Sequence, residues 1–495
     1  MVRKSSLVLA VMTAFISSYF AYEIVYIFPK VTTAVGMILN IVLVSAEILT
    51  AIFSMYLYHS VFCSMEWRHV NYKGLKSFPF VSIQIPVFNE PIKTLRETLK
   101  ACRNMDYPNN RYEILIADDS TDKKDMKKIR ELCKEYGAKF VHRDHRSGFK
   151  AGALNGILQH SRGKYIALLD ADDRPEKTFL SHSVEVIESK NNIAFVQTRN
   201  AERNDDVNMV TGIGRMIRDL FFGSIMKSKD MRKLSIFCGS GGVIKRSVLD
   251  EMGGWPEQTV TEDIDISTKI FAHGYESKFI NPVECKGLLP MSFSSLTGQT
   301  YRWAHGTTKT LMLRWRSVMK IPGFWRKSEH LLSCATYVLG PAILIIDLIM
   351  AAHLLFKIPI FHMYEPMTVW VFGVALTLSS FFALLYVQFL DKKVDMKRIF
   401  AYIFAMYGLS VNFTFAVISA LIGRKFSFFR TPKTKQKKNY AKIAKRYWIE
   451  SVIAGVSIYS GVINITDPVY NVQALWVIFF GIGFLSAPIL ALKYG

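Results

Sequence analysis

Long apolar runs near both ends of the chain, separated by a long region that has none, most constrain how it can fold. Each run approaches the ~20 residues that a helix needs to cross the hydrocarbon core of a bilayer. Residues 62–328 contain no such run, which predicts a large soluble domain between two membrane segments. The apolar runs are Leu7–Phe28, Val31–His59, Leu332–Phe356, Met367–Leu390, Ile399–Ile422, Tyr447–Ile465 and Val472–Leu492.

The positive charge of the chain is concentrated beside its apolar runs. The net charge is +22, and the densest basic block, Arg424–Arg446, lies between two apolar segments. That placement fits the positive-inside rule and contact with anionic lipid better than it fits nucleic acid, so no nucleic-acid partner is expected. The six cysteines show neither metal-ligand spacing nor a paired framework, which favours a reducing compartment for the soluble domain.

Charges near the N-terminus predict the orientation in the membrane. Arg3 and Lys4 precede the first apolar run and should stay in the cytosol. The run is long, lacks a convincing cleavage site and leads into a second run, so we interpret it as a retained anchor and not a signal peptide. Two spanning helices then return the chain to the cytosol near Phe62, and the soluble domain is expected to be cytosolic.

Strand and helix patterns alternate after residue 80. Alternation at this spacing predicts an α/β domain with a mostly parallel sheet whose binding crevice lies at the carboxyl ends of the strands. The predicted strands are Val81–Ile85, Glu113–Ala117, Lys139–His142, Lys164–Leu169 and Ile193–Gln197. The predicted helices are Ile92–Arg103, Lys123–Tyr136, Phe149–His160 and Glu176–Ser189.

An aspartate pair directly follows one of the buried strands. Asp170 and Asp172 are one residue apart at the end of Lys164–Leu169. Hard divalent cations such as Mg²⁺ or Mn²⁺ prefer oxygen ligands and keep positions open for phosphate oxygens, so the pair is a candidate metal site. An isolated pair of this kind is also typical of an Asp-rich turn, and its neighbours must decide between the two.

Further polar groups are predicted at the same edge of the sheet. Asp118 and Asp119 follow a second strand and can accept hydrogen bonds from a base or a ribose. Lys150 lies at the start of a helix, where backbone N–H groups also favour phosphate, although a lysine in a first turn is more often solvated. No GxGxxG follows the first strand, which argues against a dinucleotide fold.

Three motifs follow the predicted sheet. The first is Phe237, Cys238, Gly239 and Ser240, whose glycine allows the backbone to approach a ligand or simply forms a turn. The second places Glu262 and Asp263 after Thr261. In the third, Gln299, Arg302 and Trp303 have the spacing that projects three side chains from one face of a helix.

Taken in order, the motifs PVFNE, ADDS, DAD, TED and QTYRW resemble those of the membrane-embedded, processive family 2 glycosyltransferases of the cellulose synthase and hyaluronan synthase type. The segment Phe428–Lys433 is similar to the FxVTxK gating loop of that family, with arginine in place of valine. The segment Lys286–Pro290 looks closer to the mannan- and glucan-synthase-like branches. The resemblance extends over residues 1–492 and implies a GT-A domain inserted in a helical membrane domain.

The resemblance also implies roles for individual residues. Asp118 or Asp119 would hold the base and ribose, Lys150 the diphosphate, and Asp170 with Asp172 the nucleotide and its metal. Asp263 would be the general base. Acceptor binding would involve Trp303, Glu262, Phe237, Cys238, Gly239 and Ser240, and the nucleotide would also meet Gln299, Arg302, Phe428, Thr431 and Lys433.

The family pattern suggests how the membrane segments are divided. A full span at Ile399–Ile422 would put the basic block outside the cytosol, against the positive-inside rule. Members of the family have an interfacial helix there, which leaves about six spanning helices, with both termini cytosolic. The expected divisions are 1–61 and 329–390 with two spans each, 62–328 as the glycosyltransferase domain, 391–446 as the interfacial helix with the gating loop, and 447–495 with two spans.

The function expected from this resemblance is processive synthesis of a polysaccharide at the plasma membrane. A UDP- or GDP-hexose would donate its sugar, with inversion, to a β-linked glycan that leaves through a transmembrane channel. The alternative is the transfer of a single sugar to a lipid or lipid phosphate, because lipid glucosyltransferases share the same motifs. The chemistry needs a cation at the diphosphate, a carboxylate base and an aromatic face for a sugar ring.

Overall fold

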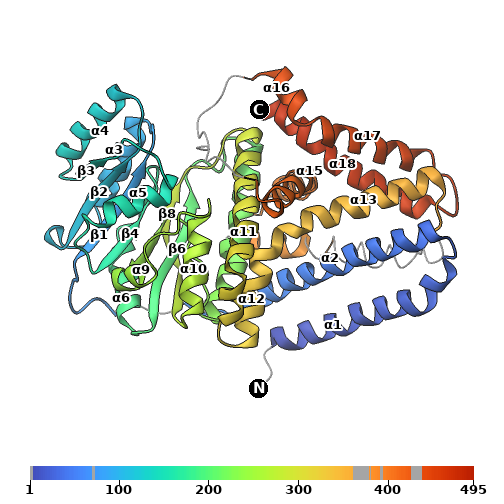
Figure 1. The fold of residues 1–495 in the computed structure, drawn as a ribbon, viewed down its shortest axis with the longest axis horizontal. Coiled ribbons are helices and arrows are strands. Elements are labelled where there is room, and N and C mark those ends of the chain that lie inside the picture. The colour runs from blue at the N-terminus through green and yellow to red at the C-terminus, as the bar shows by residue number, and fades with distance from the viewer. Residues whose placement is uncertain (1–3, 70–72, 361–377, 379–380, 391–393, 425–437) are drawn as a thin grey trace.

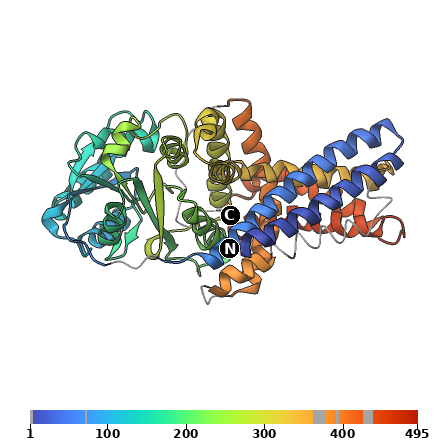
Figure 2. The ribbon, with the colours of Figure 1, turned by 90° about the horizontal axis from the view of Figure 1, so that it is seen from below.

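The computed structural model describes residues 4–69, 73–360, 378, 381–390, 394–424 and 438–495. An α/β domain lies at one end of the molecule and a bundle of long helices at the other (Figures 1 and 2). The start of the first helix and the end of the last one both lie where the bundle adjoins the α/β domain. The two ends of the described chain are therefore on the same side of the bundle.

One eight-stranded sheet organises the α/β domain. Its strand order is β3-β2-β1-β4-β7-β6-β8-β5. The first four strands of that order are parallel, and β7 is antiparallel to both β4 and β6. The strands are β1 (Val81–Val87), β2 (Tyr112–Asp118), β3 (Lys139–His142), β4 (Tyr165–Leu168), β5 (Arg174–Pro175), β6 (Ile193–Glu202), β7 (Gly242–Lys245) and β8 (Glu276–Gly287).

Helices cover both faces of the sheet, because its central strands carry apolar side chains on both sides. On β4, Ile166 and Leu168 pack into one core while Tyr165 and Ala167 pack into the other, as the two-residue period of a strand requires. Helices α3, α4 and α6 contribute to the core on the Tyr165 side, whereas α5, α9 and α10 contribute to the core on the Ile166 side. These helices are α3 (Ile92–Arg103), α4 (Lys123–Glu135), α5 (Phe149–Leu158), α6 (Phe179–Glu188), α9 (Arg246–Glu251) and α10 (Glu262–Ala272).

The predicted α/β fold is confirmed, with boundaries that differ by a few residues. All five predicted strands and all four predicted helices are present. The differences lie at the ends, where β6 extends to Glu202 and α6 begins at Phe179. The sheet is mixed at one side because β5 and β7 run against their neighbours, which the local pattern does not reveal.

Three helices form the junction between the α/β domain and the bundle. They are α7 (Met209–Leu220), α11 (Phe293–Lys320) and α15 (Met396–Leu421). One apolar cluster joins all three, with Val210 and Ile213 from α7, Phe293 and Leu296 from α11, and Leu409 from α15. The α/β domain therefore rests on the bundle through a continuous apolar contact.

The bundle contains helices long and apolar enough to cross a membrane. Among the described residues five such segments occur: Ala10–Lys30, Ala34–Glu66, Phe324–Phe356, Met396–Leu421 and Asn471–Tyr494. Two shorter apolar helices are Phe381–Leu390 and Trp448–Val462. The corresponding labels are α1 (Lys4–Tyr22), α2 (Ala34–Glu66), α12 (Phe324–Ala335), α13 (Leu339–Phe356), α17 (Trp448–Val462) and α18 (Asn471–Tyr494).

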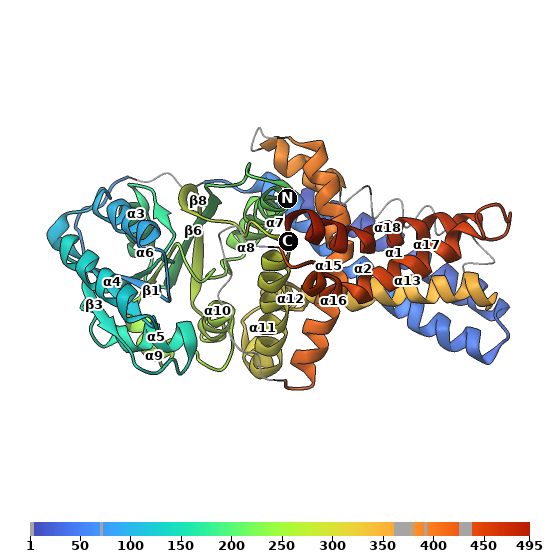
Figure 3. The same cartoon turned by 90° about the horizontal axis from the view of Figure 1, so that it is seen from above.

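Helix α15 lies across the other helices of the bundle. It is viewed end-on in Figure 1, where α13 and α18 run in the plane of the picture, and it runs across them in Figure 3. The assignment of α15 to the membrane interface stays a prediction from the sequence. The count of six spans stays a prediction, because most of Met367–Leu390 lies outside the described residues.

Candidate functional site

Lys150 is the centre of the candidate site. It lies in the first turn of α5, and its Nζ donates to Asp170 Oδ1 at 2.8 Å and to the carbonyl oxygen of Gly239 at 2.7 Å. Glu262 Oε1 lies 3.7 Å from the same Nζ. Segments far apart in the sequence, the end of β4, the loop before β7 and the start of α10, therefore converge on one ammonium group.

The charges around Lys150 decide its protonation. Burial alone lowers the pKa of this ammonium, but the carboxylates of Asp170 and Glu262 outweigh that effect and raise the pKa above its ordinary value. Lys150 therefore stays positively charged throughout the physiological range. A fixed cation at the carboxyl ends of parallel strands is suited to bind phosphate oxygens.

Asp263, the predicted base, lies at the start of α10 beside Lys150. Desolvation by the surrounding protein and the neighbouring carboxylate of Glu262 raise the pKa of Asp263 to about 7. The amide of Ile264, Lys150 and Arg302 act in the opposite direction but do not offset the rise. A carboxylate with a pKa near neutrality is matched to accept a proton at physiological pH.

Gly239 allows this close arrangement. Its φ is +75°, and a Cβ built on it would lie 3.1 Å from Asp263 Oδ2 and 3.5 Å from Lys150 Nζ. A side chain at this position would be strained and would enter the space between the base and the cation. The glycine therefore lets the backbone carbonyl reach Lys150.

A buried glutamine holds the loop that carries Gly239 through hydrogen bonds to the loop backbone. Gln197 Oε1 accepts from the amide of Cys238 at 2.8 Å, and Gln197 Nε2 donates to the carbonyl of Ser240 at 2.8 Å. Phe237 is fully buried, and its ring meets Phe195 edge to face. The side chain of Phe237 thus anchors the loop in the core, which leaves the backbone and the following residues to face the site.

Helix α11 places the last predicted motif beside α10. Gln299 is buried, whereas Arg302 and Trp303 are half-buried, and Arg302 is close enough to lower the pKa of Asp263. A Cβ built on Gly306 would lie 2.5 Å from the Cγ2 of Thr261, so the two elements are in direct contact there. The motif on α11 therefore lies against the start of α10.

An ion pair fixes the register of these two helices. Arg314 Nε donates to Asp265 Oδ1 at 2.6 Å, and the hydroxyl groups of Thr261 and Thr310 lie 3.1 Å apart. Asp265 is fully buried, so its pairing with Arg314 is shielded from solvent. Asp265 lies two residues beyond the predicted base, but Arg314 was not identified from the sequence because it lies 49 residues away from Asp265.

The aspartate pair is divided between two environments. The Asp170 side chain is 40% exposed and contacts Lys150. Asp172 is 3% exposed, and its Oδ2 accepts from the amide of Leu288 at 2.8 Å. Asp173 fixes the turn, since its Oδ2 accepts from the amide of Asp170 at 2.8 Å. Asp170 is thus the more open of the two carboxylates, whereas Asp172 is held in place at the turn.

The oxygen donors at this turn fit a hard divalent cation. The donors are carboxylates, which Mg²⁺ and Mn²⁺ prefer over nitrogen or sulfur. Among the residues that the structure describes, no group of three or more histidine, cysteine, aspartate or glutamate side chains is arranged to hold a metal.

The second predicted aspartate pair is held by a basic pair on the adjacent strand. Asp118 Oδ2 lies 2.7 Å from His142 Nδ1, and Asp119 receives two hydrogen bonds from Arg143, at 2.9 Å and 2.7 Å. Neither His142 nor Arg143 was among the site residues predicted from the sequence. Their position at the carboxyl end of the predicted strand Lys139–His142 is the signal that could have identified them.

The remaining predicted residues lie outside the described part of the chain. Phe428, Thr431 and Lys433 belong to the segment 425–437. Their assignment to the nucleotide stays a prediction from the sequence. Around Lys150, the structure brings together Asp170, Gly239, Glu262, Asp263 and Arg302.

Comparisons with known proteins find similarity to glycosyltransferases. Residues 82–253 match the family model described as Glycosyl transferase family 2. A probable glucomannan 4-beta-mannosyltransferase 11 of Arabidopsis thaliana is 33% identical over 247 residues, covering 47% of this chain and 54% of the relative. The cellulose synthase catalytic subunit [UDP-forming] of Xanthomonas axonopodis pv. citri is 31% identical over 285 residues, covering 56% of this chain and 38% of the relative. The chain thus spans about half the length of the curated relatives it matches.

A solved structure shares the fold. It is a mannosyltransferase from Pyrobaculum calidifontis in complex with GDP-Man and Mn²⁺, with a TM-score of 0.56 and 18% identity. The alignment covers 78% of this chain and 100% of that protein. At this identity the likeness concerns the fold alone.

Proposed function

We propose that the chain is a cellulose-synthase-like glycosyltransferase of family 2, which transfers a hexose from a nucleotide-diphosphate sugar to a growing β-linked polysaccharide and moves the product across a membrane. The observation that carries the proposal is the convergence on Lys150 of Asp170, the Gly239 carbonyl and Glu262. Lys150 supplies a fixed cation in this proposal, and Asp263, which lies beside it, supplies the carboxylate base. Displacement of a diphosphate by a hydroxyl group needs both.

The proposed reaction is a single displacement. Asp263 accepts the proton of the acceptor hydroxyl while the oxygen of that hydroxyl attacks the anomeric carbon of the donor. The nucleoside diphosphate leaves from the opposite face. Lys150 and Arg302 lie beside Asp263 and stabilise the negative charge that develops on the leaving group. One direct attack inverts the anomeric centre, so an α-linked donor gives a β-linked product.

The cation and the acceptor have candidate positions in this proposal. Asp170 and Asp172 would hold a Mg²⁺ or Mn²⁺ ion, which would neutralise charge on the diphosphate when bound. Trp303 would offer an aromatic face to the acceptor sugar, and the Gly239 loop, which lies beside Asp263, would line the acceptor site. GDP-Man and Mn²⁺ in the mannosyltransferase of the same fold support the choice of ligands.

A product assay in purified membranes tests the proposal. The chain is supplied with radiolabelled UDP- and GDP-hexoses in turn, and the label is followed into polymer, into organic-soluble lipid or into neither. We expect label in polymer. Label in lipid would support the alternative function, transfer of one sugar to a lipid or lipid phosphate. The absence of transfer with every donor would contradict both.

Chelation should abolish turnover. We expect EDTA to stop sugar transfer and added Mg²⁺ or Mn²⁺ to restore it, because carboxylates beside a diphosphate need a cation to offset the mutual repulsion. The measurement is the initial rate of UDP or GDP release. The control is the circular dichroism spectrum of the chelated protein, which should not change. Full activity in EDTA would remove the metal from the proposal.

The transfer rate should fall as the pH is lowered through the pKa of Asp263. The pKa is raised to about 7, and the base works only when deprotonated, so at pH 6 about one tenth of the molecules have a competent base. The Glu262 carboxylate contributes to that rise. Glu262→Gln should therefore move the acid limb of the kcat profile to lower pH. An unmoved limb would show that another group titrates there.

A further inference from the structure

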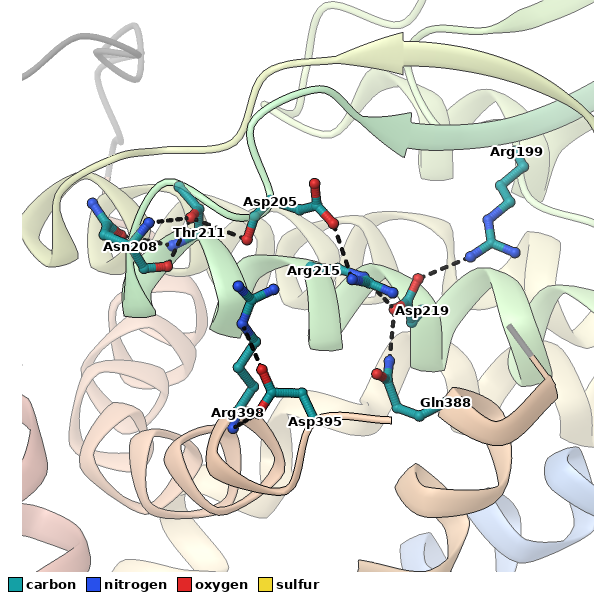
Figure 4. Close-up of polar contacts among 9 residues, drawn as sticks. All are labelled: Arg199, Asp205, Asn208, Thr211, Arg215, Asp219, Gln388, Asp395 and Arg398. Atoms are coloured by element: carbon teal, nitrogen blue, oxygen red, sulfur yellow. Dashed lines mark hydrogen bonds and ion pairs between the residues drawn. The ribbon is translucent and has the colours of Figure 1, made fainter. Parts of the chain in front are cut away.

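A buried cluster of charged residues lies where the α/β domain meets the bundle (Figure 4). Its centre is Asp219 on α7, which is 2% exposed. Asp219 Oδ1 accepts from Arg199 Nη2 at 2.8 Å, and Asp219 Oδ2 accepts from Arg215 Nε at 3.1 Å. Arg215 also pairs with Asp205 at 3.0 Å. The charges of the cluster therefore compensate one another within the protein.

The cluster extends into a helix of the bundle. Gln388, on the helix Phe381–Leu390, donates from Nε2 to Asp219 Oδ2 at 2.7 Å and is 1% exposed (Figure 4). Apolar contacts surround this bond. Val387 packs so closely against Gly223 that a Cβ built on Gly223 would lie 2.7 Å from Val387 Cγ1. The bond crosses from the bundle to the α/β domain through a buried, closely packed interface.

The other side of the cluster leads to the aspartate pair. Arg199 lies on β6, whose last residues pair with the end of β8, with Arg199 opposite Glu284 and Glu202 opposite Gly287. The next residue of the chain, Leu288, donates its amide to Asp172 Oδ2 at 2.8 Å. Arg203, just beyond β6, donates to the carbonyl of Asp172 at 2.8 Å. Two neighbouring groups at the end of β6 and β8 therefore hold Asp172.

We infer that Asp219 is a positioning residue that couples the helix Phe381–Leu390 to the donor site through Arg199. A shift of that helix moves Gln388, and with it Asp219 and β6. The end of β8 follows because it is hydrogen-bonded to β6, and the amide of Leu288 then changes its contact with Asp172. The inference rests on the proposed function, since it assigns Asp172 to the donor site.

The chemistry of the cluster favours coupling over simple packing. Apolar side chains already join α7 to the helix Phe381–Leu390, with Met216 and Leu220 against Leu384 and Val387. Replacing buried ion pairs by apolar residues is often neutral or stabilising, so the cluster adds little to cohesion. Its directional bonds instead fix one orientation of β6 relative to the helix, and groups behind a metal-binding carboxylate commonly control its affinity.

Hydrogen exchange in the full chain tests the coupling without relying on turnover. We expect Gln388→Leu and Asp219→Asn to speed amide exchange of the segment 284–289 by on the order of 10-fold, because each removes a buried hydrogen bond to a carboxylate. Gln388→Leu leaves the arginine pairs of Asp219 in place, so the fold is retained. The matched control is Ser457→Ala, which removes a hydrogen bond of 2.8 Å to the buried Asp347 elsewhere in the bundle.

A second measurement separates positioning from stability. Arg199→Met should raise the metal concentration that gives half-maximal transfer by about 10-fold, whereas Arg199→Lys, which keeps the charge, should restore it to within about 2-fold. Unchanged exchange at 284–289 in both Gln388→Leu and Asp219→Asn, or equal acceleration in Ser457→Ala, would overturn the inference. So would a lower thermal stability of Arg199→Met with unchanged metal dependence. If the wild-type chain transfers no sugar, the proposed function fails, and the exchange experiment still decides the coupling.

Discussion

Asp263→Asn should bind the nucleotide-sugar donor nearly as well as the wild type and transfer the sugar about 10²–10⁴-fold more slowly. The substitution keeps the shape of the side chain but removes the group that accepts the proton of the acceptor. Lys150 and Asp170, which meet the donor in the proposed reaction, keep their contact at 2.8 Å. The measurement is kcat for transfer together with donor affinity from equilibrium binding.

A matched control for this substitution lies two residues along α10. Asp265→Asn also neutralises an aspartate but acts on the contact with Arg314 and not on the proton. We expect it to weaken the fit between α10 and α11 and to lower transfer far less than Asp263→Asn. Near-normal turnover in Asp263→Asn would contradict the assignment, and the role of base would pass to Glu262 or Asp265.

The strands of the α/β domain were predictable because burial on both faces produces short apolar runs. Predictions succeeded for β2 and β4, whose apolar side chains fill cores on both sides of the sheet, and for β1, whose apolar side chains fill one core. The direction and order of the later strands were not predictable. β7 contains only Gly242–Lys245 and lies between β4 and β6, and nothing in four residues encodes which partners they take.

The chemistry of the site was predictable from the sequence, but the residues that hold the site residues in place were not. Parallel strands end at one edge, so Asp118 and Asp170 were expected near a common crevice. These holding residues act through contacts between segments that are distant in the sequence. Gln197 reaches Cys238 across 41 residues, and Gln388 reaches Asp219 across 169 residues. No local pattern marks such pairs, because a buried glutamine or aspartate gives the same signal wherever its partner lies.

The environment of Asp172 also differs from what the motif suggests. From their spacing alone, Asp170 and Asp172 are both candidate ligands of one cation. In the structure Asp172 is buried and bound by the amide of Leu288, whereas Asp170 is exposed toward Lys150. The difference arises from β8, which the sequence analysis did not identify and which brings Leu288 to the turn.

Lys150→Met should lower kcat/KM for transfer by about 10²-fold or more and raise the KM for the donor. The methionine fills a similar volume but supplies no charge, so Asp170 and Glu262 lose the cation that they share. A buried carboxylate left without its partner is strongly unfavourable, and the developing charge on the diphosphate loses a fixed donor. The measurement is the steady-state rate of nucleotide release over a range of donor concentrations.

The same substitution should move the pH profile, which separates a loss of charge from a general loss of structure. Lys150 lowers the pKa of Asp263, so removing it should raise that pKa and shift the acid limb of kcat to higher pH. Lys150→Arg keeps a positive charge at this position and should leave the limb close to its wild-type position, even if the geometry of donor binding suffers. An unmoved limb in Lys150→Met would show that Lys150 does not act on the base. A limb displaced in Lys150→Met and preserved in Lys150→Arg would show that one ammonium group serves both the leaving diphosphate and the carboxylate that receives the proton.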